Sequence, residues 1–250
     1  MDEPVLALGD TVPPGDAVPS WDARLARRRS PWLVPGGLLL ILILLTVNVL
    51  ADGPLVGADR RIRAAVQAQA TSATWRWLSD SWHAPAKLIV YLGSYQVAVP
   101  VLAACTLIAA ARHRRLRPLL PAFAGVVLLV TTVTAGKILI GRAGPGLTAV
   151  GAGGLGVFPS GHTTTATVCL GVALMLLLPD LPARARRAAV AAVAGLCLLV
   201  GAALVWCDDH WFTDVVAGWA LAGLIVQAAV KLARCPLPRR AIRLRGRRRG

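Results

Sequence analysis

Long apolar runs separated by short polar segments dominate the chain from residue 33 to residue 233. A helix needs roughly 20 apolar residues to cross about 30 Å of hydrocarbon. Runs of about this length fall at residues 33–51, 88–111, 119–140, 161–178, 187–206 and 211–233. The pattern therefore predicts an all-α protein in which six transmembrane helices form one bundle, a single domain over residues 33–233.

The two ends of the chain differ from this apolar part. Residues 1–32 are rich in Pro and Asp and then become basic, which predicts a disordered cytoplasmic tail. A signal peptide is not expected, since the first apolar run starts late and lacks a small-residue cleavage site. Residues 234–250 are rich in Pro and Arg and predict a basic cytoplasmic tail.

The segment from Arg60 to Trp82 allows two interpretations. It alternates charged residues, Ala and Trp, as an amphipathic helix at the membrane interface does. A plain loop outside the membrane would show a similar composition. The sequence leaves both open.

Composition supports the membrane assignment and sets the orientation. Hydrophobic residues make up 56% of the chain, and the formal net charge is +15. In a soluble protein this charge would indicate nucleic acid, but here the basic residues lie between and after the apolar runs. With the N-terminus inside, 20 of the 27 Lys and Arg residues fall in cytoplasmic segments. The positive-inside rule thus predicts that both termini are cytoplasmic. Scarce Lys beside Arg, with heavy use of Ala, Leu and Val, indicates a GC-rich bacterial genome, so the membrane we expect is a bacterial plasma membrane.

Three polar segments would then meet on the extracytoplasmic side. They run from Lys137 to Pro145, from Pro159 to His162 and from Asp208 to Asp214. Ionisable residues at this membrane depth are costly and are functional candidates by default. Asp208 and Asp209 would repel a phosphate, so we expect them to face away from it or to pair with Arg142.

These segments hold the groups that phosphoryl transfer needs. Ser160 is a good N-cap for the helix that follows, and the free N–H groups of Gly161 and His162 favour a bound anion. His210 and Asp214 are four residues apart, so on a helix the carboxylate can orient the imidazole. Lys137 and Arg142 add cations suited to phosphate oxygens. The cysteines form no C-x-x-C pair, so no metal site is predicted, and no cofactor is expected.

At these residues the sequence resembles the type 2 phosphatidic acid phosphatase (PAP2) superfamily over roughly residues 85–230. The family carries the motifs Lys-x6-Arg-Pro, Pro-Ser-Gly-His and Ser-Arg-x5-His-x3-Asp. The second is complete at residues 159–162, and the end of the third is complete at residues 210–214. Two motif arginines are absent, because Gly144 and Leu204 stand at their positions.

The resemblance implies a role for each residue. His210 would attack phosphorus and form a phosphohistidine, His162 would protonate the leaving alkoxide, and Asp214 would orient His210. The phosphoryl oxygens would be bound by a further set, namely Lys137, Arg142, Ser160 and Gly161.

The function expected from these roles is metal-independent hydrolysis of a lipid phosphate monoester or diphosphate, of the phosphatidate, phosphatidylglycerol phosphate or polyprenyl diphosphate type. The partners are that substrate and membrane lipids, and nucleic acid is not expected. The missing arginines keep open a non-catalytic binder of lipid phosphates, and polar residues within the membrane keep open a transporter.

Overall fold

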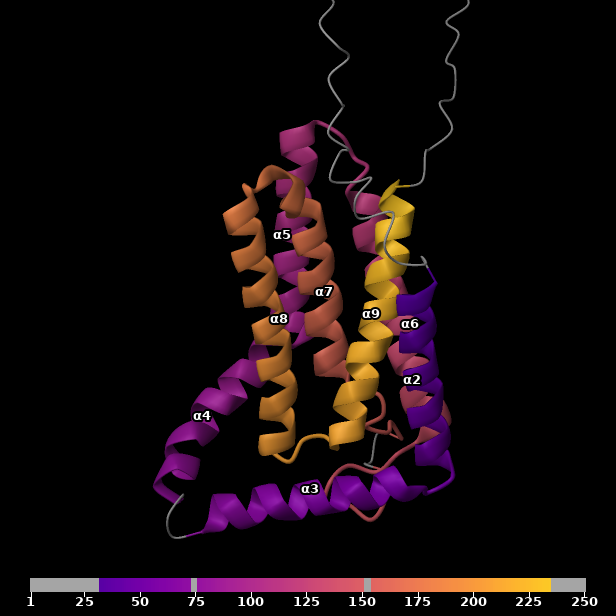
Figure 1. The fold of residues 1–250 in the computed structure, drawn as a ribbon, viewed down its shortest axis with the longest axis vertical. Coiled ribbons are helices and arrows are strands. Elements are labelled where there is room, and N and C mark those ends of the chain that lie inside the picture. Colours follow the sequence, from indigo (N-terminus) through magenta and orange to yellow (C-terminus); the bar gives the residue numbers. More distant parts are fainter. Residues whose placement is uncertain (1–31, 73–75, 151–153, 235–250) are drawn as a thin grey trace, which may run out of the picture. The chain divides into compact units, whose positions relative to one another are not determined.

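The computed structural model describes residues 32–72, 76–150 and 154–234. The predicted tails lie almost wholly outside these residues, and what we expect of them stays a prediction. The described part is helical (Figure 1), and its α-helices are α2 (Leu33–Leu50), α3 (Pro54–Thr71), α4 (Arg76–Leu92), α5 (Tyr95–His113), α6 (Leu119–Ile140), α7 (Gly161–Leu177), α8 (Ala183–Trp206) and α9 (Phe212–Arg234). The predicted all-α class is confirmed.

Six of these helices have the length and composition to cross a membrane, as the apolar runs predicted. They are α2, α5, α6, α7 with the 3-10 turn that follows it, α8 and α9. The second span begins at Tyr95 and not at residue 88. The chain turns at Gly93 and Ser94, where Ser94 takes an extended conformation before α5. The apolar run from residue 88 therefore belongs to two helices.

The segment between the first two spans is helical, so the interpretation as a plain loop was wrong. It forms α3, which starts with Pro54 in its first turn, and α4. Proline suits this position because its missing N–H would have no helical partner there. In Figure 1, α3 runs across the ends of α8 and α9, and α4 leads obliquely back toward α5. Both helices therefore lie at the end of the bundle where α9 begins.

Helix α7 lies at the centre of the bundle and contacts α5, α6, α8 and α9. Its side chains from Thr163 to Ala166 are buried, and Val168, Cys169 and Val172 are completely covered. Gly218 of α9 lets the start of α7 approach closely, since a Cβ there would lie 3.1 Å from the carbonyl oxygen of Ser160. The backbone N–H of Ser160 also donates to the carbonyl of Asp214 at 3.0 Å. The first turns of α7 and α9 are thus fixed to each other.

Candidate active site

The start of α7 has the geometry of an anion-binding helix terminus. Ser160 is the N-cap, and its Oγ accepts from the backbone N–H of Thr163 at 3.4 Å and from the Thr163 hydroxyl at 3.0 Å. Its side chain is completely buried. The first N–H groups of a helix have no partner within the helix, so those of Gly161 and His162 remain available to an anion.

The chain just before α9 presents His210 with an oriented imidazole. Nδ1 of His210 lies 3.4 Å from Oδ2 of Asp214, which also accepts from the backbone N–H of Trp211 at 3.1 Å. A carboxylate beside Nδ1 favours the tautomer with its proton on Nδ1. Nε2 then keeps its lone pair and is the nucleophilic atom of the ring.

One cavity of about 400 Å³ brings four of the predicted site residues together. Lys137 of α6, His162 of α7 and His210 all line it, together with Gly161. The rest of its wall comes mainly from α5 and α6 and is mostly apolar: Ser94, Tyr95, Val99, Val126, Leu129, Val130, Val133, Thr134 and Thr165. His162 and His210, which are 48 positions apart in sequence, thus line the same cavity, and most of the remaining wall is apolar.

The loop between α6 and α7 holds Lys137 in place. Helix α6 ends at Ile140 and is capped by Gly141, which adopts a left-handed conformation with φ +56°. The returning chain pairs with the end of α6, since the N–H of Gly156 donates to the carbonyl of Lys137 at 3.0 Å. A Cβ on Gly156 would lie 2.6 Å from the backbone nitrogen of Arg142, so only glycine fits. Nζ of Lys137 donates back to the Gly156 carbonyl at 3.0 Å.

Arg142 lies beside the nucleophile's carboxylate and does not line this cavity. Its Nη1 donates to Asp214 and to the Thr213 hydroxyl, and its Nη2 donates to Asp59 at 2.7 Å. Only 9% of its side chain is exposed. The expected role of Arg142 on substrate phosphate stays a prediction, while in this structure the guanidinium binds two carboxylates.

Asp208 and Asp209 pair with cations other than Arg142. Arg63 of α3 donates to both carboxylate oxygens of Asp208 at 2.7 Å. Lys87 of α4 donates to both oxygens of Asp209 at 2.9 Å. These hydrogen bonds raise the pKa of Arg63 and the pKa of Lys87. Both acidic side chains are therefore neutralised, which lowers their repulsion of a bound phosphate.

Helices α3 and α4 contribute neighbours that sequence reasoning did not assign to the site. Asp59, Arg63 and Lys87 belong to this group. Trp211, directly after His210, also contacts this group. Its ring lies 5.3 Å from the Arg142 guanidinium carbon and its Nε1 donates to the Ala143 carbonyl. Lys87 stood out only as one of three lysines in an Arg-rich chain.

At the two positions without a motif arginine, Leu204 and Gly144 pack against apolar side chains. Leu204 is completely buried in a cluster that includes Ala86 and Val90 of α4. A Cβ at Gly144 would lie 3.4 Å from side-chain atoms of Leu147 and Val157. No guanidinium is present at either position, so the cations of the site come from other parts of the chain.

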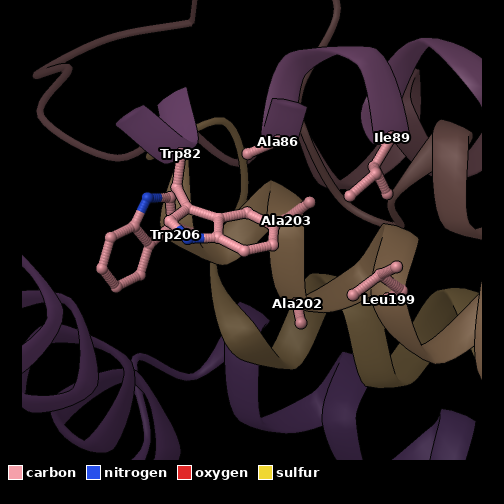
Figure 2. A pocket seen from close by; sticks show the side chains of 7 residues that line it. All are labelled: Trp82, Ala86, Ile89, Leu199, Ala202, Ala203 and Trp206. Carbon is pink, nitrogen blue, oxygen red and sulfur yellow. The ribbon is translucent and has the colours of Figure 1, made fainter. Parts of the chain in front are cut away.

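A second pocket, of about 290 Å³, lies between α4 and α8 and has a different character. Figure 2 shows the side chains that line it: Trp82, Ala86, Ile89, Leu199, Ala202, Ala203 and Trp206. None of them carries a titratable group. The chemistry is therefore assigned to the cavity of His162 and His210.

Comparison with known proteins agrees with this geometry. Residues 118–234 match the family model of the PAP2 superfamily. This match covers the part of the chain that holds Lys137, His162, His210 and Asp214. A search of curated proteins finds no match. The described fold is similar to the crystal structure of a transmembrane PAP2 type phosphatidylglycerolphosphate phosphatase from Bacillus subtilis, with a TM-score of 0.63 and 21% identity over 79% of this chain and 94% of that one. The family match and the fold both agree with a phosphatase of the PAP2 type that spans the membrane.

Proposed function

We propose that this PAP2 protein removes phosphate from a membrane lipid through a phosphohistidine on His210, without a metal ion. The observation that carries the proposal is the shared cavity: His162, His210 and Lys137 line one end, and apolar side chains of α5 and α6 line the rest. Such a cavity suits a ligand with one anionic and one hydrocarbon end. Phosphate monoesters and diphosphates of lipids have this form.

The first step is attack on phosphorus. Nε2 of His210 forms the N–P bond while the ester P–O bond breaks, and Asp214 stabilises the imidazolium that results. His162 gives its proton to the departing alkoxide oxygen, as a general acid. Lys137 and the N–H groups of Gly161 and His162 stabilise the phosphoryl oxygens. We assign Arg142, two residues from the vacant motif position at Gly144, to this charge as a further cation that acts from behind Asp214, since its guanidinium is bound to Asp59 and Asp214 and does not line the cavity.

The second step returns the enzyme to its starting state. Water attacks the phosphohistidine, His162 takes one of its protons, and the N–P bond breaks. Inorganic phosphate leaves, and His210 is again neutral with its proton on Nδ1. His162 acts twice, as the acid of the first step and the base of the second. His210 also acts twice, as the nucleophile and then as the leaving group.

The substrate is a lipid whose tail lies along α5 and α6. Phosphatidate, phosphatidylglycerol phosphate and polyprenyl diphosphate all fit this description. The similar Bacillus subtilis structure is that of a phosphatidylglycerolphosphate phosphatase, and for this reason phosphatidylglycerol phosphate is the first substrate that we would test.

We place the active site on the extracytoplasmic side of a bacterial plasma membrane. The basic turns around Arg112 and Arg184 lie at the end of the bundle opposite the site, where Arg112 pairs with Asp180 at 3.6 Å. The positive-inside rule puts this end in the cytoplasm. The substrate's headgroup then meets the site from the outer leaflet.

Phosphate release from a panel of lipids tests the proposal. Purified protein in detergent, with a chelator and no added metal, should release inorganic phosphate from at least one lipid phosphate of the panel. The panel holds matched pairs with the same tail and one or two phosphates. A wild-type protein that binds these lipids and releases no phosphate would instead support the non-catalytic binder, which the absence of arginine at positions 144 and 204 favours.

The apolar half of the cavity makes a prediction of its own. Val126→Trp fills the space between α5 and α6, so we expect KM for a long-chain lipid phosphate to rise by about 10-fold, equivalent to about 1.4 kcal/mol of binding. The kinetics with a water-soluble short-chain phosphate should stay within about 2-fold of wild type, since its binding uses only the polar end. The measurement is the ratio of the two KM values.

Val127→Trp is the matched control. Val127 follows directly on α6, is exposed, and lies outside the cavity wall. It should leave both KM values unchanged. Equal effects of the two variants on long and short substrates would contradict the placement of the tail.

A further inference from the structure

Asp59 is a buried carboxylate that the proposed mechanism does not yet use. It lies on α3, outside the family match at residues 118–234, and only 1% of its side chain is exposed. Oδ1 accepts from the backbone N–H of Thr213 at 3.0 Å, and Oδ2 accepts from the Thr213 hydroxyl. Oδ2 also lies 2.7 Å from Nη2 of Arg142. Burying an unpaired charge is costly. The donors around Asp59 compensate this cost, so its burial is a specific feature of the fold.

Arg142 connects Asp59 to the carboxylate that orients the nucleophile. One guanidinium nitrogen binds Asp59, and the other binds Oδ1 of Asp214. This leaves Oδ2 of Asp214 directed at Nδ1 of His210. A planar guanidinium held at both nitrogens cannot rotate freely. The Asp214 carboxylate is therefore fixed from the side away from His210.

Two carboxylates share the charge of Arg142. If Asp59 were neutral, the whole guanidinium charge would act on Asp214 and compete with His210 for it. With Asp59 ionised, Asp214 keeps negative charge for the imidazolium that forms during attack. The arrangement thus affects both the geometry and the charge of the orienting group.

We propose that Asp59 is a positioning residue for catalysis: by holding Arg142 it fixes Asp214, so that His210 presents Nε2 to the phosphorus atom. This inference rests on the proposed phosphatase function. It makes α3, a helix outside the matched family region, part of the active site. Asp59 touches neither substrate nor His210 and acts through Arg142 and Asp214.

An anchoring role for α3 alone would have a different signature. The pair of Arg63 with Asp208 also ties α3 to the loop before α9, so α3 has a second attachment. A purely structural loss would lower the amount of folded enzyme and leave the rate constant of the remaining enzyme unchanged. A positioning role lowers the rate constant itself and depends on Asp214.

The test is a double-mutant cycle on the full-length protein with Asp59→Asn and Asp214→Asn. The readout is the single-turnover rate constant of phosphate transfer, which does not depend on the folded fraction. We expect Asp59→Asn to lower it by about 10- to 100-fold and Asp214→Asn by about 10³- to 10⁴-fold. Because Asp59 acts through Asp214, the double variant should match Asp214→Asn within about 3-fold.

Asp52→Asn is the control, since Asp52 pairs with Arg60 of α3 on the exposed surface. It should keep the wild-type rate constant. If Asp59→Asn does not fold, Thr213→Val replaces it in the cycle, because it removes the hydroxyl that joins Asp59 and Arg142. Its effect on the rate constant should also vanish in the Asp214→Asn background.

The outcomes separate this inference from the function on which it rests. If phosphate release requires His210 but Asp59→Asn keeps the wild-type single-turnover rate constant, the inference alone is overturned. Effects of Asp59→Asn and Asp214→Asn that multiply in the double variant also overturn it, because they show independent action. A wild-type protein that releases no phosphate from any lipid of the panel overturns both.

Discussion

Replacing His210 with Ala should abolish phosphate release. We expect kcat to fall by at least about 10⁴-fold, since loss of a nucleophile removes the covalent path and leaves only binding and charge stabilisation. The imidazole is buried at the wall of the cavity, with Nδ1 directed at Asp214. No other side chain of the described cavity wall carries a comparable nucleophile next to an orienting carboxylate. The measurement is inorganic phosphate released from the best lipid of the panel.

His113→Ala is the matched control for this variant. His113 is also a histidine, but it ends α5 at the opposite end of the bundle, where it lies 3.6 Å from Asp180. It should keep full activity. If His210→Ala retained a tenth of the wild-type rate while remaining folded, attack by His210 would be excluded.

The expected effect of His162→Ala depends on the leaving group. For a lipid alkyl phosphate we expect kcat/KM to fall by about 10²- to 10⁴-fold, since the alkoxide leaves without a proton. For 4-nitrophenyl phosphate the loss should be about 10-fold or less, because nitrophenolate is a far weaker base and needs little protonation. The difference between the two substrates isolates proton transfer from phosphate binding.

The comparison is made within one protein, so differences in folding cancel. Kinetics of wild type and His162→Ala on both substrates are sufficient. His162→Asn adds a variant that can still donate a hydrogen bond to phosphate. Equal losses on both substrates would show that His162 binds phosphate and does not act as the general acid.

Local sequence patterns predicted the parts of this protein that depend on local physics. The sequence predicted span α6 with the bounds 119–140, because a mainly apolar run ends there and is followed by Gly141, the C-cap. The N-cap at Ser160 followed from a hydroxyl before a long apolar run. The approach of His210 to Asp214 was predicted from their spacing of four residues, although His210 lies just before α9 and not on the helix. Each of these depends on neighbours within a few residues.

The contacts that were missed join distant residues. Asp59 meets Arg142 across 83 positions, and Arg63 meets Asp208 across 145. No periodicity relates such pairs, and α3 showed only the mixed charge that an interfacial helix and a loop share. The main result that sequence patterns therefore missed is the pairing of the Arg142 guanidinium. The sequence predicted that Arg142 binds phosphate oxygens, whereas the structure places its guanidinium between Asp59 and Asp214.

The second span illustrates a different limit. The apolar run from residue 88 crosses the turn at Gly93 and Ser94 without a change in hydropathy, and therefore α4 and α5 looked like one helix. The turn matters for function because α4 packs beside Leu204 and carries Lys87 toward Asp209. Hydropathy reports which residues avoid water, and it does not report where a helix axis changes direction.

Trapping of the phosphoenzyme tests the central claim most directly. Purified enzyme is mixed for milliseconds with a lipid whose phosphate carries ³²P, quenched in alkali, digested and mapped by peptide. The account predicts an acid-labile, alkali-stable label on the peptide containing His210, in amounts that approach one per active site and disappear in His210→Ala. Label on any other residue, or phosphate release with no labelled enzyme at any time, would contradict it.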